Sequence, residues 1–399
     1  MDHREMMLNA IKGKGTDVLP FVPRLDLWYK ANKHNGTLPD RYKKASLMEM
    51  TRDLGVGYHA VVPDFKDLNS PEDEADRALG ISCLRAMPFR YAFASVERTI
   101  KYENDLTMVE YRTPAGVIRT KVLYDDEMRK AGITISHTLE HAIKSTGDLE
   151  IAAYIFRDIQ VIDDSSGYEE FKAGIGENGI TVAYAGLAAS GMHHIQKELM
   201  PVDSFFYEQF DHPDELKVLS DAIEGYFDKV FEAVSKSSAE VVFYGSNYDS
   251  SITYPPFFRD HIVPSLKKRA KQLHKNDKLL LTHTDGENKG LLEHYVDSDI
   301  DIADSICPYP MTTHTLKDIR KVFGKNITIW GGIPSVSLLQ NSMSDIEFER
   351  FLNKTLEDAG SGDHLILAIA DTTPPAADFS RIKKIIDACN SFGRVMPSV

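Results

Sequence analysis

The residues best suited to chemistry are grouped in the motif His283-Thr284-Asp285-Gly286-Glu287, which directly follows the apolar run KLLLT. In an extended chain, residues i and i+2 point the same way, so His283 and Asp285 are able to share one ligand. An imidazole and a carboxylate together suit Zn²⁺ or another divalent ion. The competing interpretation is that Asp285-Gly286 forms a turn and that His283 hydrogen-bonds the substrate or the backbone.

Other polar side chains follow other apolar runs of the sequence. Cys307 would add a thiolate and Asp371 a carboxylate oxygen to a metal site. Trp28, with Tyr29, forms either an aromatic wall for an apolar ligand or part of the core. His193 could face the pocket, although adjacent histidines on an irregular loop seldom converge on one ion. The candidate catalytic residues are His283, Asp285 and Glu287; the candidate metal ligands are His283, Asp285, Cys307 and Asp371; the candidate substrate contacts are Arg24, Asp26, Trp28, Asn247, Asp249 and His193.

Eight short apolar runs alternate with longer amphipathic segments, and the candidate residues follow the runs. Continuous apolar runs are typical of strands buried on both faces of a parallel sheet. Eight such strands alternating with helices predict an α/β (β/α)₈ TIM barrel, in which residues after the strands meet at one end. An open doubly wound sheet is the alternative, but no GxGxxG follows the first run. The runs are 19–23, 58–63, 180–186, 240–245, 278–283, 301–306, 327–332 and 364–371, and the amphipathic segments include 213–236, 255–275, 286–297, 315–323 and 345–358.

One interval interrupts this alternation. Between the second and third runs, residues 95–105, 107–113 and 117–122 alternate with period two and are separated by turn signals. They predict a three-stranded antiparallel meander. We therefore expect one barrel domain over 1–399, with an insertion at 70–175 that forms a lid or specificity wall.

The composition excludes several classes of protein. Among 399 residues, 46 Lys and Arg against 60 Asp and Glu give a formal charge of −14, which is unfavourable for nucleic acid and for anionic lipid surfaces. Three widely spaced cysteines predict no disulfide framework, and a reducing cytoplasm fits best. The N-terminus does not resemble a signal peptide, and no apolar run reaches 18 residues.

Three segments carry a resemblance to a known family. MMLNAIKGKGTDVLPFVPR, DHIVPSLKKRAKQLHKNDKLLLTHTDG and KVFGKNITIWGGIPS resemble the uroporphyrinogen decarboxylase superfamily. The resemblance implies a single (β/α)₈ barrel and, at the level of the family, a homodimer. It also implies one of two activities: cofactor-independent decarboxylation of a porphyrinogen, or methyl transfer to or from a corrinoid or thiol at a zinc site.

Departures from the family pattern favour the second activity. The decarboxylases carry Arg-Gln-Ala-Gly-Arg after the first strand, whereas this sequence reads Pro23-Arg24-Leu25-Asp26-Leu27 and retains only Arg24. An aspartate there would repel a polycarboxylate. The zinc methyltransferases carry His-x-Cys and a later Cys, and the corresponding residues here look like His283, Asp285 and Asp371. Carboxylates in place of thiolates form a harder ligand set, better suited to polarising an oxygen.

The resemblance implies a methyltransferase of the corrinoid-dependent branch. It would move a methyl group between a small O- or N-methyl substrate and a corrinoid held by a partner protein, assisted by zinc or another divalent metal. Arg24 would pair with a substrate carboxylate, and loss of His283 would abolish transfer with little loss of stability. The alternatives are a cofactor-independent decarboxylase of a small or tetrapyrrole acid, and a barrel that only binds a tetrapyrrole or corrinoid.

Overall fold

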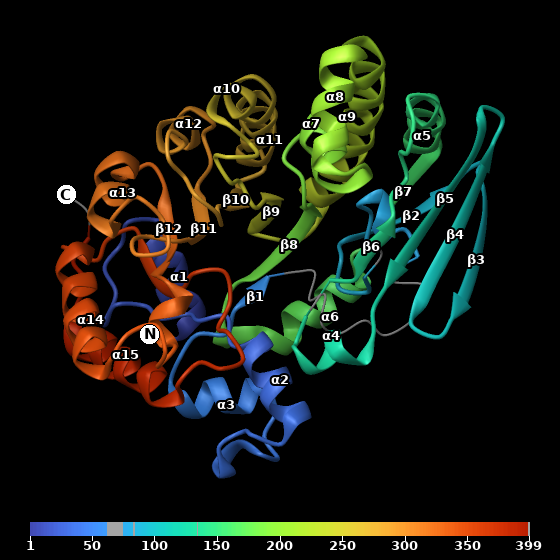
Figure 1. Cartoon of the computed structure of the whole chain (residues 1–399). Helices are drawn as coiled ribbons and strands as arrows, with labels where there is room; N and C mark the ends of the chain where they lie inside the picture. Colours follow the sequence, from blue (N-terminus) through green and yellow to red (C-terminus); the bar gives the residue numbers. More distant parts are fainter. Residues whose placement is uncertain (62–74, 83, 134, 398–399) are drawn as a thin grey trace.

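The centre of the structure is a seven-stranded parallel sheet that curls on itself (Figure 1). The computed structural model describes residues 1–61, 75–82, 84–133 and 135–397. Strand order in space follows strand order in the chain, as expected when a crossover connection follows each strand. Nearly every strand residue is buried, which explains the continuous apolar runs. The strands are β1 (Ala60–Val61), β8 (Thr181–Gly186), β9 (Val241–Ser246), β10 (Leu279–His283), β11 (Ile302–Ile306), β12 (Thr328–Ile333) and β13 (Leu365–Ile369).

The predicted first strand, 19–23, is wrong as a regular strand. Its backbone nevertheless connects the two edges of the sheet: Val22 N donates to Leu367 O (2.9 Å) in β13, and Phe21 O accepts from Gly57 N (3.1 Å), just before β1. Pro20 and Pro23 lack an N–H group, so neither can donate a hydrogen bond to a neighbouring strand. Of the eight predicted strands, the structure therefore shows seven in one curled parallel sheet, and the first is a short connecting segment. The second predicted strand is described only as far as Val61.

Trp330 of β12 holds this connecting segment through a buried hydrogen bond. Its side chain is completely buried, and its indole Nε1 donates to Val22 O at 3.2 Å. We expect Trp330→Ala to lower the free energy of unfolding by about 3–5 kcal/mol, because a large core side chain is lost. Trp330→Phe keeps most of the volume and should cost only about 1–2 kcal/mol, through the unpaired Val22 carbonyl. Urea unfolding measures both, and equal losses for the two variants would contradict this account.

The exposed Tyr207 gives the matched control for this comparison. It is 72% exposed, so Tyr207→Ala should change the free energy of unfolding by no more than about 0.5 kcal/mol.

Helices surround the curled sheet, and most predicted amphipathic segments are helical. The exception is 286–297, where only α12 forms; Gly286 (φ +113°) and Gly290 (φ +77°) adopt loop conformations before it. Within the described residues, no helix is long and apolar enough to cross a membrane. The helices are α1 (His3–Ile11), α2 (Asp26–Asn35), α3 (Leu47–Leu54), α4 (Asp126–Lys130), α5 (Gly147–Asp158), α6 (Ser166–Ile175), α7 (Gly191–His194), α8 (Val202–Asp211), α9 (Pro213–Lys236), α10 (Pro255–Phe257), α11 (Val263–His274), α12 (Leu292–Asp297), α13 (Leu316–Phe323), α14 (Asp345–Ala359) and α15 (Phe379–Phe392).

Two antiparallel sheets lie between β1 and β8 in the sequence. The three predicted meander strands are present as β3, β4 and β5, and β6 adds a fourth that the alternation did not predict. Helix α5 lies between this sheet and α9, to one side of the curled parallel sheet (Figure 1). That the segment is an insertion with a lid function stays a prediction, and its part before residue 75 lies outside the described residues. The strands are β2 (Phe89–Phe93) paired with β7 (Ile159–Asp163), and β3 (Glu97–Glu103), β4 (Leu106–Thr113), β5 (Gly116–Leu123) and β6 (His137–Glu140).

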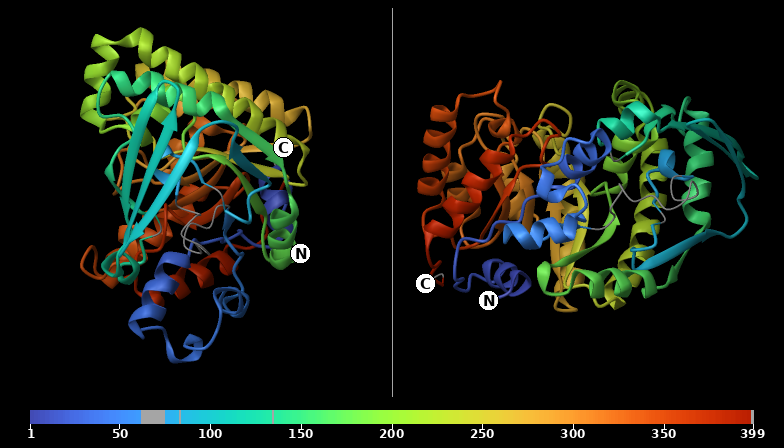
Figure 2. Two further views of the ribbon diagram at one scale, coloured as in Figure 1. Left: turned by 90° about the vertical axis from the view of Figure 1, so that its right-hand side faces the viewer. Right: turned by 90° about the horizontal axis from the view of Figure 1, so that it is seen from below.

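The two ends of the chain meet on one side of the molecule (Figure 2). An antiparallel bridge joins Thr16 to Val395, with reciprocal backbone hydrogen bonds of 3.0 Å. The first and last parts of the sequence are therefore fixed to each other beside the connecting segment at 20–22.

Candidate metal centre

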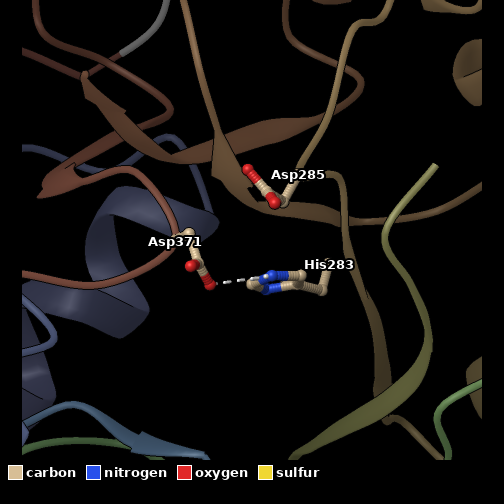
Figure 3. A group of neighbouring side chains, drawn as sticks. All are labelled: His283, Asp285 and Asp371. Carbon is tan, nitrogen blue, oxygen red and sulfur yellow. Dashed lines mark ion pairs between the residues drawn. The ribbon is translucent and has the colours of Figure 1, made fainter. Parts of the chain in front are cut away.

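Three of the predicted ligands meet at the carboxyl ends of the strands. Potential ligand atoms of His283, Asp285 and Asp371 all lie within 4.8 Å of one another, and His283 Nε2 is 3.5 Å from Asp371 Oδ1 (Figure 3). His283 is the last residue of β10, and Asp285 follows two residues later. Asp371 comes two residues after β13 and adopts a left-handed conformation (φ +56°), which aspartate tolerates better than most residues. Curling of the sheet brings β13 back to β10.

A buried carboxylate on the next strand fixes the His283 ring. Asp304, within β11, is opposite His283 in register, and its Oδ2 lies 2.7 Å from His283 Nδ1. His59 Nε2 lies 3.7 Å from the other oxygen, Oδ1. A carboxylate at Nδ1 holds the ring in the tautomer whose Nε2 is available to a metal, an arrangement common around histidine ligands.

The interaction between His283 and Asp304 favours the protonated imidazole and the ionised carboxylate. Burial opposes protonation of His283, but hydrogen bonds and charge interactions with Asp304 and Asp371 outweigh it and raise its pKa to about 9. Burial likewise works against ionisation of Asp304, but the hydrogen bonds from His283 and His59 hold its pKa far below the ordinary value. The pKa of Asp371 is lowered despite burial, by His283 and then Arg24, whereas burial raises that of Asp285. A metal would therefore compete with a proton on His283.

Arg24 pairs with protein carboxylates at this site. Its Nη1 lies 3.4 Å from Asp371 Oδ1, and its Nε lies 3.4 Å from Asp26 Oδ2. Asp26 is buried at the first position of α2, where its Oδ1 also accepts from Leu27 N at 2.8 Å. The guanidinium thus connects the start of α2 to the Asp371 loop, which orients Asp371 toward His283.

Two other predicted site residues lie outside the three-residue group. Cys307 is buried, its Sγ contacts Pro308 O at 3.7 Å, and burial together with the nearby Asp285 and Asp371 charges raises its pKa to about 12. Glu287 accepts hydrogen bonds from Thr313 N (2.9 Å) and Oγ1 (2.8 Å), so it connects its loop to the segment after β11.

The predicted substrate contacts divide into two groups. Asn247 and Asp249 follow β9 beside the cluster: Asn247 N donates to His283 O (3.0 Å), and Asp249 Oδ2 accepts from Glu287 N (3.2 Å). Trp28 and His193 are instead placed in the core. The Trp28 indole donates to Ala377 O and stacks on Phe379, while His193 Nδ1 accepts from Ala189 N and its ring packs against Tyr248.

The sequence analysis missed Asp304, His59 and Lys197. Asp304 interrupts the otherwise apolar β11 run, and a buried acid in the middle of a strand is a usable signal because it requires a partner. His59 immediately precedes β1 and gives no such signal. Lys197, in the π-helical turn Ile195–Leu199 after α7, reaches Asn247 Oδ1 at 3.1 Å.

The donor set fits a divalent metal ion. One imidazole nitrogen and two carboxylates, with the other imidazole nitrogen bound to Asp304, satisfy the ligand chemistry of Zn²⁺ and related ions. The three-residue set contains carboxylates and no thiolate, so it is harder than a thiolate site.

Comparison with known proteins agrees with the fold. The uroporphyrinogen decarboxylase (URO-D) family model matches residues 196–392, a span that contains all three residues of the cluster. The predicted resemblance to the uroporphyrinogen decarboxylase superfamily is thus confirmed over residues 196–392. Among solved structures, the chain is similar to a methyltransferase from Methanosarcina mazei, with a TM-score of 0.50 and 14% identity over 98% of this chain and 99% of that chain. This likeness shows a shared fold. No curated protein matches the sequence.

Proposed function

We propose that the protein is a metal-assisted methyltransferase, which moves a methyl group between a small O- or N-methyl compound and a corrinoid held by a separate protein. The observation that carries the proposal is the grouping of His283, Asp285 and Asp371 at the strand ends, with His283 oriented by the buried Asp304. The URO-D family match and the shared fold with a methyltransferase support it.

Cleaving a methyl–oxygen or methyl–nitrogen bond requires help for the leaving atom, because alkoxides and amines leave poorly. A bound divalent ion would supply Lewis acidity at that atom, and the corrinoid would supply the nucleophile that accepts the methyl group. The residues that would hold the ion are His283, Asp285 and Asp371. In the alternative mechanism without a bound ion, Asp285, whose pKa is raised by burial, would hold a proton next to the leaving atom.

The surrounding residues position these groups. Asp304 keeps a proton on His283 Nδ1 and so reserves Nε2 for the reacting side of the cluster. Arg24 orients Asp371. Asn247 and Asp249 follow the neighbouring strand β9, from which they would orient a substrate. Arg24, the predicted partner of a substrate carboxylate, already contacts two aspartates, so we assign it to positioning.

The proposal is tested with cob(I)alamin and a panel of methoxy and methylamino compounds, using protein purified without added metal. We expect the protein to contain a divalent metal and to methylate cob(I)alamin with at least one donor, as followed by the spectral change of cobalamin. Chelation of the metal should abolish the reaction and re-addition should restore it. Release of CO₂ from a small carboxylic acid would instead identify a decarboxylase, and cobalamin binding without turnover would identify a binding protein.

A further inference from the structure

Two cationic side chains lie beside the metal-ligand cluster, and they differ in their partners. Arg24 contacts the carboxylates of Asp26 and Asp371. The Lys197 ammonium contacts only neutral oxygens: Ser246 O at 3.2 Å and Asn247 Oδ1 at 3.1 Å. Among the described residues, no carboxylate lies within ion-pair distance of Lys197.

The neighbouring acid, Glu198, forms its ion pair with Arg77 and not with Lys197, although its charge acts on the ammonium. Glu198 is the next residue in the same π-helical turn, and its carboxylate is buried in an ion pair with Arg77. Widened turns of this kind occur often at functional sites, because they place one side chain out of the helical pattern. Here the side chains of two consecutive residues point to different partners. The Glu198 carboxylate pairs with Arg77, and the Lys197 ammonium contacts residues at the end of β9.

Lys197 is close to the proposed reaction centre. Its ammonium hydrogen-bonds the side chain of Asn247, whose backbone N donates to His283 O at 3.0 Å. Ser246, which supplies the other acceptor, is paired with His283 in the β9–β10 register. The charge of Asp285 acts on Lys197 as well. The Lys197 ammonium therefore lies at the end of β9, the strand next to β10, which carries His283 at the same end of the sheet.

A half-buried ammonium with two neutral acceptors retains one N–H for a further partner. Burial lowers the pKa of Lys197 to about 8, so most molecules still carry the charge at pH 7. An anionic ligand group would offset the cost of burying that charge and would form a charge-assisted hydrogen bond.

We propose that Lys197 binds a carboxylate of the substrate, so that the methyl compounds acted on are small methylated carboxylic acids. The inference rests on the proposed function for the role of the substrate, but it makes a separate claim about binding. The carboxylate would lie toward the end of β9, and the methylated heteroatom would lie toward His283 and Asp371. Lys197 takes the role that the sequence suggested for Arg24.

The test compares binding of matched acids and amides by isothermal titration calorimetry. The ligands are methoxyacetate, 3-methoxybenzoate and N,N-dimethylglycine, each against its primary amide, with zinc-supplemented protein at pH 7. We expect the wild type to prefer at least one acid over its amide. Lys197→Gln keeps a hydrogen-bond donor but removes the charge, and it should weaken binding of that acid about tenfold and of its amide less than about twofold.

Two further variants separate substrate binding from a structural role. Lys197→Arg keeps the charge and should retain the preference for the acid. Lys289→Gln removes a positive charge from an exposed residue of the loop after β10 and should bind every ligand as the wild type does. Equal weakening of acid and amide in Lys197→Gln would show a purely structural role and overturn the proposal. Unchanged acid binding in Lys197→Gln would overturn it too, because the carboxylate would then be bound by the metal or by Arg24.

The outcomes also distinguish this inference from the proposed function. If no wild-type acid binds better than its amide, the inference fails, whether or not cob(I)alamin is methylated by other donors. If acid binding depends on Lys197 but no donor methylates cob(I)alamin, the inference stands and the methyltransferase proposal fails.

Discussion

Replacing His283 with Asn is expected to lower kcat/KM for methyl transfer about a thousandfold while the protein remains folded. The Asn side-chain amide can still donate to Asp304, as His283 Nδ1 does at 2.7 Å, but it has no atom in place of Nε2, which faces Asp371. Loss of one ligand removes Lewis-acid assistance worth several kcal/mol, and each 1.36 kcal/mol corresponds to about tenfold in rate. The initial rate of cob(I)alamin methylation and the metal content measure the effect.

The choice of Asn over Ala follows from the buried partner. The sequence alone suggested that removing His283 would cost little stability, but Asp304 is only 2% exposed and would lose its closest cation in His283→Ala. Breaking a buried ion pair from one side typically costs about 3–5 kcal/mol. His294→Asn, which alters a histidine of α12 paired with the exposed Asp297, is the control and should keep full activity. Activity above about a tenth of wild type in His283→Asn would refute the site.

Metal-free protein is expected to lose stability as the pH rises from about 6.5 through 9. A proton that His283 binds more tightly in the folded chain stabilises the fold, and this contribution is complete below the unfolded pKa of about 6.5. It is lost as the pH rises through the folded pKa of about 9, with a total on the order of 3 kcal/mol. The low pKa of Asp304 contributes stability above its unfolded pKa of about 4, which is lost as the pH falls below that value. Urea unfolding in the presence of chelator, from pH 4 to 10, measures the loss of stability on the alkaline side.

The variant Asp304→Asn should flatten this profile and weaken metal binding. Without the Asp304 carboxylate, only Asp371 still opposes the lowering effect of burial on the pKa of His283, so the decline above pH 6.5 should shrink. Loss of the carboxylate behind a histidine ligand typically reduces metal affinity by about 10–100-fold. Asp297→Asn removes a 67% exposed carboxylate 3.7 Å from His294 and should retain the wild-type profile. An unchanged pH profile in Asp304→Asn would show that the His283–Asp304 pair does not hold the proton.

The sequence was sufficient for the strand framework and for part of the site. Runs of buried apolar residues located β8 to β13 within one or two residues, because a strand covered on both faces has to be apolar along its length. The position of a polar residue after such a run then determines which end of the sheet it occupies. That reasoning correctly brought His283, Asp285 and Asp371 together, although Asp371 lies 88 positions beyond His283 in the chain.

The sequence could not assign partners to these side chains. Cys307 and Glu287 follow strands as Asp371 does, but local backbone directions place them outside the cluster. Trp28 and His193 are compatible with a pocket or with a core, and only packing against Phe379 and Tyr248 decided for the core.

What the sequence by itself determined is the identity and order of strands β8 to β13 and the end at which the polar residues gather, since these depend on local hydrophobic pattern. What only the tertiary structure decided is which charges pair. Asp304 became the partner of His283 through the register of β10 and β11, and Arg24 became the partner of Asp371 through curling of the sheet. Lys197 forms no ion pair with the neighbouring Glu198, because the Glu198 carboxylate pairs with Arg77. Such pairings depend on distances between residues remote in the chain, which no local pattern specifies.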